Sequence, residues 1–193
     1  DTLDVFVCHF PSRSGGAKES ESYRLYAAHI LRMEVDSIMS IRSLPQVIIM
    51  GDFNDYPTNQ SILKILKAEA PPVKTNDLAS TTDSANASTV TPSSLKLYHL
   101  LARKAKSKNF GSYKYRGEWG LLDHLIVSGT LLNQSNHFFT SEEKANVCLL
   151  PFLLKDDEKY GDKEPFRTYK GMKYQGGISD HLPIYTDFEL IVY

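Results

Sequence analysis

The sequence has almost no net charge, few cysteines and no long apolar run. Its 193 residues include 22 lysines and arginines against 23 aspartates and glutamates, which leaves a formal charge of −1. Without a strong positive field, the chain is not a generic polyanion binder of the histone type, although a local basic patch is compatible with this balance. No stretch is apolar for the roughly 20 residues that a membrane-spanning helix needs.

The two cysteines, Cys8 and Cys148, lie far apart in the sequence and match no metal-ligand spacing. Two buried free thiols are favoured on general grounds, and a disulfide between them stays open. The cysteines therefore indicate no metal centre.

A hydrophobic content of 41% suits one globular domain with a real core, or part of a larger one. The chain opens with DTLDVFVCHF, which reads as an interior strand already under way, without an initiating methionine or a leader. We therefore expect residues 1–193 to form a single partial domain, the C-terminal part of a longer protein.

The apolar pattern predicts three helices. Residues 20–41 carry apolar side chains at three- and four-residue steps, which predicts a long amphipathic helix. A second helix is expected to begin at Thr58 and to end before Pro71, and a short third one is expected over 95–108.

Strands are expected between these helices. The β-branched and aromatic content predicts them at 3–10, 46–50, 112–116, 121–128 and in the closing segment 179–193. Residues 71–94 are mostly small and polar, which predicts a surface loop. Because strands and helices mix without a strict repeat, the α+β class or a layered sandwich is favoured.

The stretch GDFND, residues 51–55, ends an apolar strand with acids and an amide. Asp52 and Asn54 stand two residues apart, so extended backbone would point both side chains to one side. A carboxylate holds or deprotonates a water, and an amide donor binds a phosphoryl oxygen without adding negative charge. Taken alone, an Asx-rich turn is the simpler reading.

Three further strand ends carry polar residues that suit phosphate or metal chemistry. ISDHLPI places Asp180 beside His181, and Asp123 interrupts the apolar LLDHLIVS, where a carboxylate needs a partner such as a histidine. His9 ends the first strand. Each has a plain structural reading, as a capping aspartate, a half-buried histidine or a solvent-facing strand end, but their conjunction favours a site.

In the order His, Asp-x-Asn, Asp, Asp-His, these residues resemble the endonuclease/exonuclease/phosphatase superfamily, the DNase I-like metal-dependent phosphohydrolases. GDFN and SDH are its most recognisable motifs, and the match spans essentially the whole chain. HFPSRSGG, SYKYRGEW and GGISDHLPI are similar to a bacterial branch known mostly as hydrolases. The resemblance implies an α+β fold, a four-layer α/β/β/α sandwich whose N-terminal portion is missing here.

The resemblance also implies a role for each matched residue. Asp52 would orient or deprotonate the attacking water, and Asn54 would bind the phosphoryl oxygens. His181 would contact the phosphate, and Asp123 would fix its tautomer. Asp180 would hold the metal or its water shell, together with Asp52.

His9 would be the second histidine facing the scissile phosphate. Arg13, Tyr113 and Arg116 are weaker candidates for substrate contacts, whereas Trp119 is expected to be a packing residue. Mg²⁺ or Mn²⁺ is the implied cofactor, because it would neutralise the charge of the phosphate ester. The family's principal metal-binding glutamate and an early asparagine have no counterpart in this chain.

The leading hypothesis is therefore a Mg²⁺-dependent phosphoesterase, either a nuclease or a phosphatase or diesterase acting on a lipid or sugar phosphate. The alternative is a non-catalytic binding module or an inactive fragment of this fold. The expected partners are a phosphate ester, with nucleic acid as one candidate, and a second copy bound through exposed sheet surface. Bacterial relatives are often exported, which by analogy predicts an extracytoplasmic location.

Overall fold

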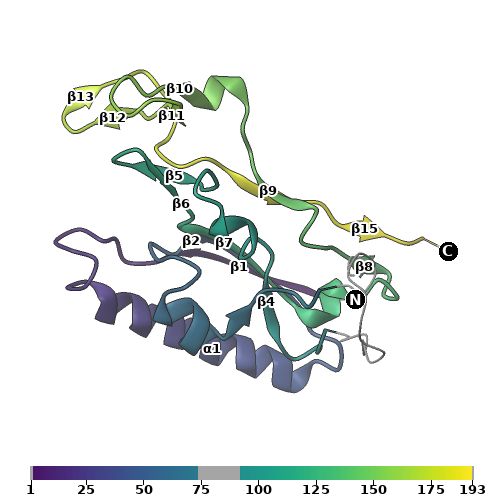
Figure 1. Ribbon diagram of the computed structural model, residues 1–193. Coiled ribbons are helices and arrows are strands. Elements are labelled where there is room, and N and C mark those ends of the chain that lie inside the picture. The colour runs from purple at the N-terminus through teal and green to yellow at the C-terminus, as the bar shows by residue number, and fades with distance from the viewer. Residues whose placement is uncertain (1, 74–91, 193) are drawn as a thin grey trace, which may run out of the picture.

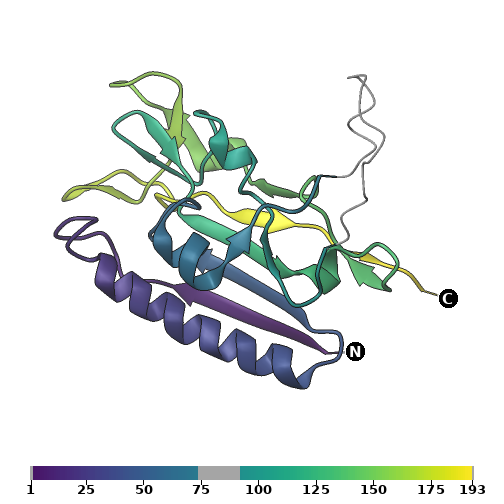
Figure 2. The same ribbon diagram turned by 60° about the horizontal axis from the view of Figure 1, so that its bottom comes forward.

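A long amphipathic helix covers one face of the main sheet. In the computed structural model, which describes residues 2–73 and 92–192, helix α1 spans Glu21–Ile41. It buries five side chains at three- and four-residue steps, as the sequence predicts: Arg24, Ala28, Leu31, Val35 and Met39. Figures 1 and 2 show α1 lying along the sheet.

The main sheet has five strands in the order β1-β2-β7-β4-β3. They are β1 (Leu3–His9), β2 (Gln46–Asp52), β7 (Asp123–Ser128), β4 (Leu97–His99) and β3 (Ala68–Glu69). Since α1 connects β1 to β2 as a crossover, these two strands run parallel. Strand β7 is antiparallel to β2, so its start lies beside the end of β2.

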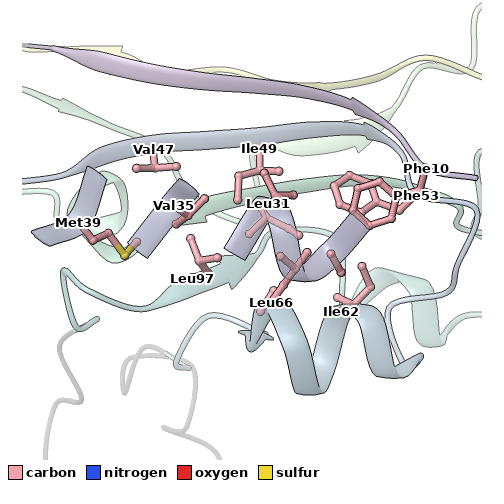
Figure 3. Packing of buried hydrophobic residues seen from close by; sticks show 13 residues of the cluster. Phe10, Leu31, Val35, Met39, Val47, Ile49, Phe53, Ile62, Leu66 and Leu97 are labelled. Atoms are coloured by element: carbon pink, nitrogen blue, oxygen red, sulfur yellow. The ribbon is translucent and has the colours of Figure 1, made fainter. Parts of the chain in front are cut away.

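Two apolar cores form on opposite faces of this sheet. The first lies between the sheet and the helices, and Figure 3 shows its side chains, including Leu31, Ile49 and Phe53. The second lies on the other face and is built on Ile48, Leu125 and Val127. The sheet is therefore a central layer with a helical layer on one side only, within the described residues.

Short paired strands cover the second core. Strand β9 (Ala145–Val147) pairs with β14 (Ile184–Thr186), and β8 (Phe138–Phe139) pairs with β15 (Glu189–Leu190). Figure 1 shows β9 and β15 on the side of the main sheet opposite α1. The predicted α+β class is confirmed, and this partial β layer faces the main sheet as in a layered sandwich.

Three hairpins gather at one end of the main sheet (Figure 1). They pair β5 (Tyr113–Tyr115) with β6 (Glu118–Gly120), β10 (Leu154–Asp156) with β11 (Lys163–Pro165), and β12 (Tyr169–Lys170) with β13 (Lys173–Tyr174). The charged run KDDEKYGDKE, at 155–164, lies in the second of these hairpins.

The remaining helical turns are short. They are the π-helix η1 (Ser61–Leu66) and the 3₁₀ turns η3 (Lys104–Lys106), η4 (Gly129–Leu132) and η5 (Pro151–Leu153). The helix predicted from Thr58 is thus reduced to η1, which ends where Lys67 adopts a left-handed conformation.

The helix predicted over 95–108 is wrong. Leu97, Tyr98 and His99 instead form strand β4, which pairs antiparallel with β7, and all three are buried. Only the η3 turn of the segment is helical. A strand buried on both faces is apolar at consecutive positions, and a short run of that kind cannot be told from a helix by periodicity.

The predicted strands and the predicted loop had different outcomes. The closing segment 179–193 is not one strand but two short ones, β14 and β15, within its described part. Strands were predicted correctly at 46–50, 112–116 and 121–128, within a few residues. Most of the predicted surface loop, residues 74–91, lies outside the described residues.

Strand β1 was expected to be buried, but it is an edge strand with an open face. Leu3, Val5 and Val7 point away from α1 and are exposed, Val7 by 78%. No described strand pairs with its outer edge. Cys8 and Cys148 are half-buried free thiols. Among the described helices, none has the length and apolar character required to traverse a lipid bilayer.

Candidate active site

Strand register places three of the predicted site residues in one row. His9 pairs with Asp52 across β1 and β2, and Asp52 pairs with Asp123 across β2 and β7. Residues paired in this way point to the same face of a sheet. Their side chains therefore meet at the sheet end where the three hairpins gather, on the face that carries the second core.

The GDFND loop forms a tight turn at the end of β2. Gly51 has φ +131°, and a Cβ there would lie 1.9 Å from the carbonyl oxygen of Cys8, so only glycine fits. The Asp52 carboxylate accepts the Asn54 backbone N–H at 2.8 Å, and the Asn54 side-chain amide donates to Asp52 Oδ2 at 3.1 Å and to the Phe10 carbonyl at 3.0 Å. The Asx turn considered from the sequence is present, and it fixes the Asp52 side chain in the row.

His181 and Asp123 form a hydrogen-bonded dyad. His181 Nδ1 lies 2.7 Å from Asp123 Oδ2, and the Ser112 hydroxyl donates to the same oxygen. An isolated bridge between Tyr113 and His181 anchors the SDH segment, with the Leu182 N–H donating to the Ser112 carbonyl at 2.7 Å. Since the carboxylate occupies Nδ1, His181 presents Nε2 as its remaining ring nitrogen.

Burial, hydrogen bonds and neighbouring charges shift the pKa values of His181 and Asp52. Burial lowers the pKa of His181, but the hydrogen bond to Asp123 and the charges of Asp123, Asp52 and Asp180 outweigh it, so this pKa is raised. Burial also raises the pKa of Asp52, and the Asn54 N–H and His181 only partly oppose that. His181, which favours its charged form, therefore lies near Asp52, a carboxylate that retains its proton more readily than usual.

His9 lies at the solvent side of the row. Its Nε2 is 3.7 Å from Asp52 Oδ2, and its side chain is 77% exposed. The His9 side chain therefore lies exposed at the margin of the row.

A buried ion pair supports the loop from behind. Arg24 of α1 donates through Nε to Asp55 at 2.8 Å, and both side chains are almost fully buried. Ser61 donates to the other Asp55 oxygen at 2.6 Å, and Arg24 also binds Ser20. This network, which the sequence patterns did not reveal, ties the GDFND loop to α1 and η1.

Two buried histidines continue the support into β4 and β7. The Leu101 N–H donates to His99 Nδ1 at 3.1 Å, His99 Nε2 lies 2.6 Å from His124 Nδ1, and His124 Nε2 lies 2.8 Å from the Asp55 carbonyl. Because the first donor and the last acceptor are backbone groups, both rings are neutral with the proton on Nε2. Burial lowers the pKa of His124 to about 4 and that of His99 well below its ordinary value.

The other predicted site residues lie around the row. Tyr113 packs on His181, with ring centroids 4.9 Å apart. The Arg13 guanidinium lies 4.8 Å from the centre of the Tyr56 ring, and Arg116 lies at the tip of the β5–β6 hairpin.

Asp180, a predicted metal ligand, is exposed and influences the pKa values of His181 and Tyr113 by its charge. Trp119 is half-buried against the second core, as expected of a packing residue.

Asp52 and Asp123 of the row, together with His181, are close enough to share a cation. One ligand atom each from Asp52, Asp123 and His181 lies within 4.8 Å of the others. Asp180 is not a member of this set. Two carboxylates and one imidazole are a donor set that hard or borderline divalent ions accept, so the residues present fit the implied cofactor.

Comparison with known proteins gives one family. A family model described as the endonuclease/exonuclease/phosphatase family matches residues 1–82 and 74–190. No curated protein matches the chain.

Two solved structures from Bacteroides thetaiotaomicron are among those that match the chain. One is a mannosyl-6-phosphatase, with 14% identity and a TM-score of 0.48 over 95% of this chain and 50% of that one. The other is an endonuclease/exonuclease/phosphatase family protein, with 15% identity and a TM-score of 0.38 over 84% and 44%. The chain spans about half the length of these structures or less. On the strength of the family model, the chain belongs to the endonuclease/exonuclease/phosphatase family.

Proposed function

We propose that this chain carries the catalytic row of a divalent-metal-dependent phosphoesterase that hydrolyses phosphate esters by in-line attack of water. The observation that carries the proposal is the register His9, Asp52, Asp123, with His181 hydrogen-bonded to the last. Groups from four separate segments thereby lie together at one end of the sheet.

Each group has a distinct task in this proposal. Asp52 accepts a hydrogen bond from the attacking water and takes its proton, a role suited to a carboxylate whose pKa is raised. The His181 Nε2–H donates to a phosphoryl oxygen, where charge accumulates during attack, and Asp123 holds the ring for this. Asn54 positions Asp52 through its own amide.

Asp52 and Asp123 supply the oxygens that would hold Mg²⁺ or Mn²⁺, with Asp180 as a further ligand through its water shell. When bound, the ion would neutralise charge on the ester oxygens. The chain's own residues still have to orient the water and donate to the phosphate.

Hydrolysis of two model esters tests the proposal. A protein that contains the whole domain is assayed with Mg²⁺ on p-nitrophenyl phosphate and bis-p-nitrophenyl phosphate, which separates a monoesterase from a diesterase. His181→Ala and Asp52→Ala should each lose about 100-fold in rate. Asp187→Ala, an exposed carboxylate outside the row, is the matched control and should retain its activity.

Equal rates in the His181→Ala variant and the unchanged protein would contradict the proposal. Anion binding without turnover of either ester would instead support the binding-module alternative. Faster cleavage of the diester would favour a nuclease or another diesterase, and this outcome should then be repeated with a short oligonucleotide.

We also propose that the open face of β1 associates with a second copy of the chain. Leu3, Val5 and Val7 form a row of exposed apolar side chains beside an unpaired strand edge. Such an edge is a template for pairing with another strand.

A further inference from the structure

A basic cavity lies among the three hairpins at one end of the main sheet. It has a volume of about 310 Å³ and lies between the β5–β6 hairpin and residues 157–170. Five cationic side chains line it against two carboxylates: Lys114, Arg116, Lys159, Arg167 and Lys170 against Asp157 and Glu164. This local excess contrasts with the chain's net charge of −1.

Both carboxylates are already neutralised. Asp157 pairs with the buried Lys114 at 3.2 Å, and the same lysine donates to two carbonyls of the 157–163 turn. Glu164 is 5% exposed and accepts from Lys170 at 3.2 Å, with Lys155 at 3.5 Å. The positive charge of the remaining residues is therefore not compensated inside the cavity.

Three cations are left without a carboxylate. Among residues 2–73 and 92–192, no acid lies in ion-pair contact with Arg116, Lys159 or Arg167. The Arg167 Nη2 donates to the Lys114 carbonyl at 3.1 Å, but its Nε is buried and has no hydrogen-bond partner in the described structure. The same guanidinium lines the cavity, where its charge attracts an anion.

The arginine is connected to the site through one aromatic ring. The Arg167 guanidinium lies 5.8 Å from the centroid of Tyr113, and that ring lies 4.9 Å from the ring of His181. A substrate whose phosphate contacts His181 would thus place its neighbouring groups against Tyr113 and Arg167.

We propose that this cavity is an anion subsite that binds a second phosphate group of the substrate, with Arg167 as its specificity-determining residue. The proposal rests on the function proposed above. A guanidinium presents a planar fork of donors that matches a phosphate, and Arg116 and Lys159 add charge at the rim. The preferred substrates are esters with two phosphates, whether on a sugar or in an oligonucleotide.

A binding experiment tests the subsite without turnover. Inorganic pyrophosphate is titrated into the chain by calorimetry at low salt, with EDTA present. Arg167→Gln should weaken binding at least about 10-fold, and Arg167→Lys should give an intermediate value. Arg42→Gln, which removes an arginine paired with Asp4 far from the cavity, should bind as the unchanged chain does.

A second variant tests the proposal if Arg167→Gln does not fold. If circular dichroism shows that Arg167→Gln has lost its fold, the double variant Arg116→Gln/Lys159→Gln replaces it, because both residues are exposed. Pyrophosphate affinity equal to that of the unchanged chain in the folded variant would overturn the proposal.

Selectivity provides the second readout. Two substrate pairs are compared by the ratio of their kcat/KM values: fructose 1,6-bisphosphate over fructose 6-phosphate, and a 5′-phosphorylated dinucleotide over the unphosphorylated one. In the pair that the unchanged protein hydrolyses faster, this ratio should fall about 10-fold in Arg167→Gln. Unchanged ratios in both pairs would overturn the subsite while leaving the proposed function intact. Absence of hydrolysis of any ester would count against the proposed function alone, and the pyrophosphate titration would then decide the subsite.

Discussion

Single residues in this chain have functions that depend on their immediate partners. Asp123 is the clearest case, because one of its oxygens receives both the Ser112 hydroxyl and His181 Nδ1. The sequence predicted the pairing of Asp123 with a histidine, since a carboxylate in an apolar strand needs a partner. It did not predict Ser112, because serine is common in loops and nothing in its neighbours marks it.

Asp123→Asn should reduce phosphoesterase activity by about 100-fold. The amide cannot accept the Nδ1 proton as strongly, so the His181 ring loses its fixed tautomer and its raised pKa. The measurement combines the rate on p-nitrophenyl phosphate with the pKa of His181 from an NMR titration. An unchanged His181 pKa in the variant would show that the dyad does not set the protonation of this ring.

At the scale of elements, strand ends were predicted better than strand partners. GDFN marked the end of β2, because an abrupt change from apolar to acidic residues is local information, whereas Asp123 begins β7 and SDH precedes β14 by a few residues. The strand β4 was mistaken for a helix because its burial comes from β7, which lies 24 or more residues away in the sequence. Arg24 and Asp55 escaped notice for the same reason, since their pairing spans 31 residues.

The junction of β1 and β2 depends on the absence of a side chain at Gly51. Gly51→Ala should destabilise the chain by more than about 3 kcal/mol, because the new Cβ would collide with the backbone of Cys8 at a positive φ. Urea denaturation measures this. Gly171→Ala has a positive φ but nothing within 4 Å, so its cost should be about 1 kcal/mol. Equal costs in the two variants would contradict the contact.

The histidine chain that joins β4 to β7 should make the fold acid-sensitive. The pKa of His124 is about 4 in the folded chain and about 6.5 when unfolded, so the unfolded state binds protons first. Stability from this group is complete above pH 6.5 and is lost as the pH falls toward 4, by on the order of 3 kcal/mol. The raised pKa of His181 acts in the opposite sense, since its contribution is present below pH 6.5 and is lost as the pH rises through its folded pKa.

Urea unfolding at several pH values between 7.5 and 4.5 measures this sensitivity. His124→Gln keeps hydrogen-bonding capacity but does not titrate, so it should be less stable at pH 7.5 and should show a flatter decline below pH 6.5. A decline as steep as that of the unchanged chain would assign the acid sensitivity to other groups.

At the scale of the whole molecule, the sequence predicted the class, the family and exposed sheet surface, but not which strand carries that surface. An apolar strand reads the same whether its neighbours are present or not, so β1 was expected to be buried. In the structure its outer face and edge are open. The cavity around Arg167 was also beyond sequence reasoning, because three hairpins assemble it and none of them carries a motif.

The open face of β1 should drive self-association of residues 1–193. Val5→Lys and Val7→Lys place charge on this face and should shift the chain toward the monomer in sedimentation velocity experiments. Met172→Lys, which replaces an exposed apolar residue on the β12–β13 hairpin, is the control and should leave the distribution unchanged. A chain that is monomeric before any substitution would contradict this prediction.

The row of His9, Asp52 and Asp123 is set by backbone pairing between strands, in which the hairpins β10–β11 and β12–β13 take no part. Those hairpins can therefore vary in length and composition while the residues of the row keep their separation. Exchanging them with the corresponding segments of a relative should alter which molecule is accepted and leave the manner of bond cleavage unaltered. Under the proposed function, substrate preference would thus be a modular trait, open to redesign by hairpin grafting.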